Sequence, residues 1–149
     1  STSFYNQPKE EYEACRLRHG RYRDLLRRLV RRTEEANRWA ALSQRSTAVP
    51  DRMSPGHPPR DIGQVKATEI AIREECNELA LQAHRERELL CAAIATVQST
   101  SSRELLESVY LNGRTLEQIA NSTGRTEKTV RRQLFPAIAH LAAASDFLV

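Results

Sequence analysis

A group of basic side chains near the C-terminal end of the chain could bind a polyanion. They lie within eight residues, only Glu127 opposes their charge, and they are Arg125, Lys128, Arg131 and Arg132. Arginine can form a bidentate contact with guanine, and threonine can contact a thymine methyl group or a phosphate. The side chains that we expect near base edges are Thr126, Lys128, Thr129 and Arg132. An arbitrary basic helix is more often a solvated surface, so the elements that carry these residues decide the interpretation.

Sequence breaks divide this part of the chain into three short helices, expected over residues 103–111, 115–122 and 126–144. The breaks fall at Asn112-Gly113 and at Gly124, where a left-handed backbone is tolerated. The last two helices are joined by about three residues, which is the spacing of a helix-turn-helix. The second helix of that motif enters the major groove of DNA, and here it would be the recognition helix, residues 126–141.

The expected helix starts have capping signals. Ser101 with Glu104, and Thr115 with Gln118, both have the spacing of a capping box. Arg114 directly precedes the second of these starts, and a helix N-terminus beside a cation favours a phosphate. We therefore add Arg114 and Thr115 to the expected DNA-binding residues.

Apolar residues at helical spacing predict that the three helices share one core. The expected inward residues are Leu105, Leu106, Val109 and Tyr110 in the first helix, Leu116, Ile119 and Ala120 in the second, and Val130, Ala137, Ile138 and Leu141 in the third. This compact arrangement favours DNA binding over a merely solvated basic face.

The preceding part of the chain predicts a long antiparallel helical hairpin. Two long helices with near-heptad apolar spacing are expected over residues 8–45 and 63–98, and residues 46–62 between them contain four of the six prolines. Gly20 is the weak point of the first helix. The second helix has two apolar rows, formed by Cys76, Ala83, Leu90 and Val97 and by Val65, Ile72, Leu79 and Ala93.

Charge supports this pairing. Residues 7–45 carry 11 basic and 6 acidic residues, whereas residues 63–102 carry 4 basic and 6 acidic residues, so the two helices attract each other. We predict an all-α fold with two domains. Residues 1–98 form the coiled-coil hairpin with a Ser/Pro-rich, solvent-exposed connector at residues 46–62, and residues 99–149 form the helix-turn-helix module.

Composition excludes several classes of protein. The 149 residues contain 5% aromatic residues and only 5 glycines, which argues against an all-β fold. There is no apolar run of the roughly 18 residues that cross a bilayer, and the start lacks a secretory signal pattern. The three widely spaced cysteines are expected to be reduced, in a cytoplasmic protein with no membrane partner. The net charge of +4 is compatible with binding to nucleic acid.

We expect neither a metal nor another cofactor, and no enzymatic activity. Cys15 and His19 are one helical turn apart, and Cys91 or His84 could approach them across a hairpin. Zinc sites, however, usually show pairs of closely spaced ligands, and only one such pair is present. No Ser/His/Asp or paired-carboxylate arrangement, dinucleotide-binding motif or P-loop is evident.

An arginine-rich run in the first long helix has two interpretations that remain open. Its members spread around the helix and are Arg16, Arg18, Arg21, Arg23, Arg27, Arg28, Arg31 and Arg32. They could form a solvated surface paired with Glu34, Glu35 and the second helix, or they could contact phosphates beside the helix-turn-helix.

The segment TLEQIANSTGRTEKTVRRQLFPAIAHL resembles the C-terminal promoter-reading helix-turn-helix of bacterial sigma factors. The matching positions are Thr115-Leu116-Glu117, Ile119-Ala120, Gly124, Thr126, Val130, Ala137-Ile138 and Leu141. Two positions depart from the pattern: Gln133 replaces a usually apolar residue, and Phe135-Pro136 lies inside the recognition helix, where proline tends to bend it. The layout of the whole chain is also similar to phage late transcription activators of the RinA/ArpU type.

The resemblance implies a regulator of phage or prophage late genes in the bacterial host cell, binding double-stranded DNA at a promoter. By motif position, the sigma recognition helix corresponds to Arg125, Thr126, Lys128, Thr129, Arg131 and Arg132. Bacterial RNA polymerase is a second expected partner, and the hairpin favours a homo-oligomer, most simply a dimer. Two alternatives stay open: an oligomeric DNA-packaging component like a small terminase, and an interaction module that binds polymerase without contacting DNA.

Overall fold

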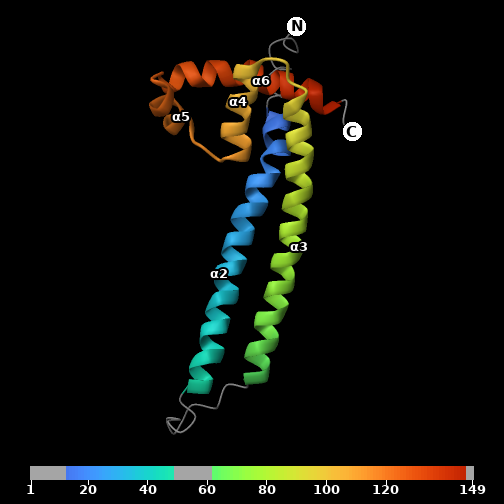
Figure 1. Cartoon of the computed structure of the whole chain (residues 1–149), viewed down its shortest axis with the longest axis vertical. Helices are drawn as coiled ribbons and strands as arrows, with labels where there is room; N and C mark the ends of the chain where they lie inside the picture. Colours follow the sequence, from blue (N-terminus) through green and yellow to red (C-terminus); the bar gives the residue numbers. More distant parts are fainter. Residues whose placement is uncertain (1–12, 49–61, 147–149) are drawn as a thin grey trace. The chain divides into compact units, whose positions relative to one another are not determined.

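The computed structural model describes residues 13–48 and 62–146, and every regular element in these ranges is helical (Figure 1). This confirms the predicted all-α class. In chain order the elements are a helix at residues 13–19, α2 (Arg21–Ala48), α3 (Ile62–Ala95), α4 (Thr100–Leu106), the π-helix η1 (Glu107–Leu111), α5 (Leu116–Thr123) and α6 (Glu127–Asp146).

The chain packs as two units, each described here by itself. The hairpin unit is Leu25–Gln82, and the terminal unit combines Ser1–Asp24 with Ala83–Val149. These packing units divide the chain differently from the sequence-based division at residue 98, which remains a prediction about domains. That predicted boundary does coincide with the residue before α4, Ser99, which caps this helix.

The first predicted helix, residues 8–45, has different limits in the structure. A turn at Gly20 separates the helix at residues 13–19 from α2, at the position expected to be weak. The Gly20 N–H donates to the Arg16 carbonyl at 2.9 Å, and the Asp24 N–H donates to the Gly20 carbonyl at 3.1 Å, so helical hydrogen bonding spans the turn. Beyond residue 45, α2 continues to Ala48. Residues 8–12 lie outside the described residues.

The second predicted helix and the connector also need correction. α3 begins at Ile62 and ends at Ala95, not at residue 98. At this end the helix tightens into a turn, in which both the Thr96 N–H and the Thr96 hydroxyl donate to the Ala93 carbonyl, at 3.2 and 2.7 Å. The expected connector at residues 46–62 is therefore helical at both of its ends, and residues 49–61 lie outside the described part of the chain.

In the hairpin unit α2 and α3 lie side by side and antiparallel (Figure 1). The predicted row Val65, Ile72 and Leu79 is buried, as is Ala36 of α2, whose side chain is fully buried. Polar pairs flank this seam. The Arg32 guanidinium donates to both Glu35 and Glu75, the Arg73 Nη2 donates to the Asn37 Oδ1 at 3.4 Å, and the Thr33 hydroxyl donates to the Cys76 Sγ at 3.7 Å.

One buried carboxylate in this seam was not predicted. Glu69 lies one heptad before Cys76 and is 5% exposed. Lys66 Nζ and Arg73 Nε reach its two oxygens from the same helix, at 3.0 and 3.1 Å. Hydrogen bonds from Lys66 and then Arg73 lower the pKa of this carboxyl, which stays charged because its own helix supplies both cations.

In the terminal unit, the helix at residues 13–19 and the first turn of α2 pack against the helix-turn-helix. The Cys15 thiol donates to the Ile138 carbonyl at 3.7 Å. His19 makes an edge contact with Tyr110, with ring centroids 6.1 Å apart. Cys15 and His19 are one turn apart and therefore share a helix face. This segment helps to bury the inner side of the C-terminal helices.

The start of α4 corrects a predicted cap. The N-cap is Ser99, not Ser101, and the Ser102 N–H donates to the Ser99 Oγ at 3.3 Å. The first helix of the module therefore begins at Thr100 rather than at residue 103. Arg103 stabilises this earlier start because its Nη1 donates to the Val97 carbonyl at 2.6 Å.

The packing of Ala36 generates a stability prediction. Ala36→Leu places extra volume where two helices meet, so unfolding in urea should show a loss of about 1 to 3 kcal/mol. Ala41→Leu is the matched control, because Ala41 is exposed on the same helix, and it should change stability by less than about 0.5 kcal/mol. Equal effects of the two variants would contradict the seam described here.

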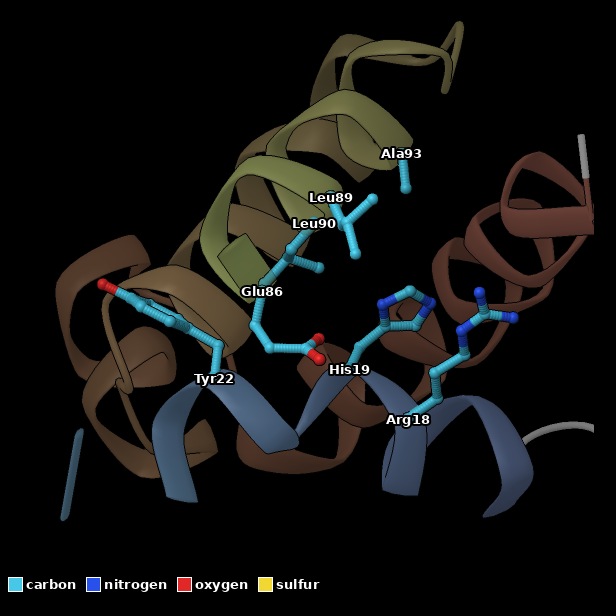
Figure 2. A pocket seen from close by; sticks show the side chains of 7 residues that line it. All are labelled: Arg18, His19, Tyr22, Glu86, Leu89, Leu90 and Ala93. Atoms are coloured by element: carbon cyan, nitrogen blue, oxygen red, sulfur yellow. The ribbon is translucent and has the colours of Figure 1, made fainter. Parts of the chain in front are cut away.

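His19 generates a prediction about pH. It is 8% exposed and lines a small cavity of about 40 Å³, toward which Glu86 of α3 is directed (Figure 2). Burial, and second the charge of Arg18, lower the pKa of His19 from 6.5 to about 4. The folded state thus prefers neutral His19, while the unfolded chain takes up a proton near pH 6.5. The stability from neutral His19 is complete above that pH and is lost as pH falls toward 4.

The measurement is the melting temperature by circular dichroism across this pH range. His19→Gln removes the titrating group, so its melting temperature should fall less steeply with acidification than that of the wild type. His140→Gln is the control, because His140 is exposed on α6, and it should keep the wild-type slope. Parallel curves for His19→Gln and the wild type would refute the assignment.

Candidate nucleic-acid interface

The position of α5 is set by caps at both of its ends. At the start, the Gln118 N–H donates to the Thr115 Oγ1 at 3.1 Å, and the Thr115 N–H donates to the Gln118 Oε1 at 2.9 Å. This confirms the predicted capping box. At the end, Gly124 adopts a left-handed conformation with φ 67°. The following Arg125 N–H donates to the Ala120 carbonyl at 3.0 Å, so the turn satisfies a carbonyl of α5.

The start of α6 has a similar device, which uses two of the predicted contact residues. The Thr129 N–H donates to the Thr126 Oγ1 at 3.2 Å, and the two threonine hydroxyls lie 2.8 Å apart. Thr126 therefore caps α6, which begins at Glu127. Its hydroxyl is used within the protein, whereas the methyl groups of both exposed threonines remain available for apolar contact.

The apolar faces of α5 and α6 meet in a small core. Ile119, Ala120 and Val130 are buried together, and the partly buried Leu105, Val109 and Leu116 pack against them. The remaining predicted inward residues, Leu106, Tyr110, Ala137, Ile138 and Leu141, are also buried. Leu134 is buried as well and was not predicted. This core turns the opposite side of α6 to solvent.

All eight predicted DNA-binding residues are exposed. They are Arg114, Thr115, Arg125, Thr126, Lys128, Thr129, Arg131 and Arg132. Lys128 and Arg132 are one turn apart on the same face of α6, and neither forms a hydrogen bond or ion pair with another described residue. Arg131 Nη2 lies 3.3 Å from the Glu127 carboxylate, an exposed pair that contributes little to stability. The basic face is therefore open rather than neutralised by the protein itself.

The two departures from the sigma pattern have different consequences. Gln133 is exposed and accepts a hydrogen bond from the Arg125 guanidinium, while its neighbour Leu134 fills the core. Gln133 therefore links the turn before α6 to the second turn of that helix. Pro136 lies inside α6, and the helix continues through it to Asp146. The residues before Pro136 form regular helix, so the basic face is intact.

The turn before α5 has a geometry that the sequence only partly predicted. Gly113 has φ 67°, as expected for the break at Asn112-Gly113. The first helix ends in the π-helix η1, which was not expected, and the Asn112 N–H donates to the Glu107 carbonyl at 3.0 Å. The Arg114 N–H then donates to the Ser108 carbonyl at 2.9 Å. These bonds define the backbone that leads into Thr115.

No group of three His, Cys, Asp or Glu side chains within residues 13–48 and 62–146 could hold a metal ion. Within these ranges, Cys15, Cys76 and Cys91 form no disulfide. None of the described helices combines the length and the apolar character that crossing a bilayer requires.

The caps generate a prediction about the module. Thr115→Ala removes the oxygen that accepts from Gln118, so thermal or urea unfolding should show a loss of about 1 kcal/mol. Thr115→Ser keeps this oxygen and should retain most of the stability. A Thr115→Ser variant as unstable as Thr115→Ala would show that the methyl group, not the cap, is responsible.

Comparison with known proteins agrees with this geometry. No curated protein and no solved structure matches the chain. Residues 99–143 match the family described as Sigma-70, region 4. This range begins at the N-cap of α4 and contains all eight predicted DNA-binding residues. Residues 99–143 are thus a sigma-factor-like helix-turn-helix, a DNA-binding type of region.

Proposed function

We propose that the protein binds duplex DNA sequence-specifically, with the N-terminal half of α6 in the major groove. The observation that carries the proposal is the open cationic face of α6 within a segment that matches sigma-70 region 4. Lys128 and Arg132 are the two cations on this face that no described residue pairs with. Both can donate to guanine, and Arg132 can do so with two parallel hydrogen bonds.

The elements around α6 supply contacts that orient it without reading sequence. The capped N-terminus of α5 presents backbone N–H groups, and the exposed Arg114 lies directly before it. A helix N-terminus and a cation together favour a phosphate. Arg125 precedes the predicted base-reading residues, Arg131 lies among them, and both arginines are exposed. We assign them to the DNA backbone, where cations add affinity but no sequence information.

We further propose that the protein is a non-enzymatic regulator of phage or prophage late genes in the bacterial cytoplasm. The resemblance of the chain's layout to RinA/ArpU-type activators supports this role. The sigma-70 region 4 match favours transcription over DNA packaging and makes bacterial RNA polymerase a natural second partner. We expect a homodimer. Light scattering on the full chain checks this, and a ring-sized mass would instead favour the packaging alternative.

A selection from random duplex DNA, followed by fluorescence anisotropy on the selected and a scrambled site, tests DNA binding. The wild type should bind with an affinity that falls with salt, by a slope of about 0.9 for each phosphate neutralised. Lys128→Ala combined with Arg132→Ala should reduce the preference for the selected site by at least about tenfold, because each removes a base contact. The melting temperature should stay near the wild-type value, since both side chains are exposed.

The matched control removes the same charge elsewhere. Arg38→Ala combined with Arg85→Ala deletes two exposed arginines outside the helix-turn-helix, and it should preserve the preference for the selected site. An equal loss of preference in both double variants would show that only net charge matters. Absence of any salt-sensitive binding by the wild type would end the proposal.

A further inference from the structure

An arginine from the N-terminal segment holds the turn that precedes α5. The Arg23 Nη1 donates to the carbonyl of Leu111, the last residue of η1, at 3.4 Å. This carbonyl lies at a helix C-terminus, where a cation interacts favourably with the helix dipole and the free carbonyls. Arg23 is separated from Leu111 by 88 positions in the sequence, so the contact is tertiary.

The Arg23 guanidinium lies directly against Gly113. A Cβ added at Gly113 would lie 2.4 Å from the Arg23 Nη2 and 2.5 Å from both Cζ and Nε. Glycine suits the φ of 67° at this position, and a side chain here would displace the Arg23 guanidinium. Gly124 has the same φ, yet a Cβ there would meet nothing within 4 Å. The guanidinium beside Gly113 therefore has no counterpart at Gly124.

The guanidinium is held by packing as much as by hydrogen bonding. Its Nε is buried and has no hydrogen-bond partner among the described residues. A buried donor without a partner costs free energy, so the contacts with Gly113 and Leu111 must hold the side chain against that cost. Since the guanidinium is partly buried here, Arg23 is poorly placed to act as a solvated phosphate contact. This separates it from the exposed members of the arginine-rich run.

The turn that Arg23 holds continues directly into the predicted phosphate-binding residues. Gly113 is followed by Arg114, whose N–H donates to the Ser108 carbonyl, and by Thr115, the N-cap of α5. We propose that Arg23 is a positioning residue for DNA binding. It orders the turn at residues 112–114 and thereby fixes Arg114 and the N-terminus of α5 for a phosphate. The phosphate part of this inference rests on the proposed function, whereas the ordering of the turn does not.

Hydrogen exchange of the full chain without DNA tests the ordering. Arg23→Met keeps the length of the side chain but removes its charge and donors. The amide hydrogens of Asn112, Arg114 and Thr115 should then exchange about two- to fivefold faster, which is the range expected for a lost cation at a helix C-terminus. The Val130 amide of α6 bonds to the Thr126 carbonyl and should keep its rate. Arg21→Met, on the same helix and exposed, should leave all four rates unchanged.

The two glycines provide a cycle that isolates the contact. Gly113→Ala and Gly124→Ala impose the same left-handed strain, but only the first displaces Arg23. Gly113→Ala should therefore lower the melting temperature more than Gly124→Ala. This difference between the two variants should disappear when each is combined with Arg23→Met. An excess that persists without Arg23, or turn amides that exchange at the wild-type rate in Arg23→Met, would overturn the ordering role.

A second cycle tests the consequence for DNA on the full chain. Arg23→Met should reduce the slope of log affinity against log salt by about one, as expected for one lost phosphate contact. Adding Arg114→Ala should then have little further effect, because Arg23 acts through Arg114. Adding Arg132→Ala should have its full effect, since that residue lies on α6. Arg23→Lys retains the charge and should recover part of the slope.

The outcomes distinguish this inference from the proposed function. Faster turn exchange together with an unchanged salt slope would confirm the ordering and overturn the role in DNA binding. Additive effects of Arg23→Met and Arg114→Ala would overturn positioning through Arg114. A wild type that binds no DNA would refute the proposed function and the phosphate part of this inference, while the exchange result would still decide whether Arg23 orders the turn.

Discussion

A helix of eight residues is too short to be stable in water by itself, and α5 has that length. Its existence depends on local satisfaction of both ends and on burial of one face. Thr115 and Gln118 satisfy the N-terminus, and the turn at Gly124 satisfies the C-terminus. Ile119 and Ala120 then pack against Val130 of α6. Because Val130 is buried, the cationic side chains before and after it face solvent, so the presentation of α6 follows from the stability of α5.

The same constraint explains why the first helix of the module ends as it does. The π-helix η1 and Gly113 leave a turn whose carbonyl at Leu111 needs a donor. Arg23 supplies it from a segment far away in the sequence. In the helix before α2, His19 contacts Tyr110 and Cys15 contacts Ile138 from one face. Residues 13–24 are therefore part of the inner packing of the helix-turn-helix module. A fragment that contains only the helix-turn-helix would lack these contacts.

The hairpin unit shows how a charged residue is accommodated between two helices. Glu69 lies at a heptad position where apolar side chains are expected. Lys66 and Arg73 of the same helix neutralise the charge of its carboxylate. Arg32 adds a link to Glu75 across the pair. For this arginine, at least, the interpretation of the arginine-rich run as paired surface is supported. Arg23 instead donates to the Leu111 carbonyl in the turn before α5, a role that neither interpretation anticipated.

The sequence by itself determined the helical class, the positions of most breaks, the capping box at Thr115 and the inward faces of the three short helices. These features depend on neighbouring residues and on periodicity, which a sequence displays directly. Tertiary structure decided that Leu134 is buried beside the exposed Gln133. It also decided the roles of His19, Arg23 and Glu69. Each of these polar groups derives its environment from packing or charges around it, and residue type and spacing alone do not specify that environment.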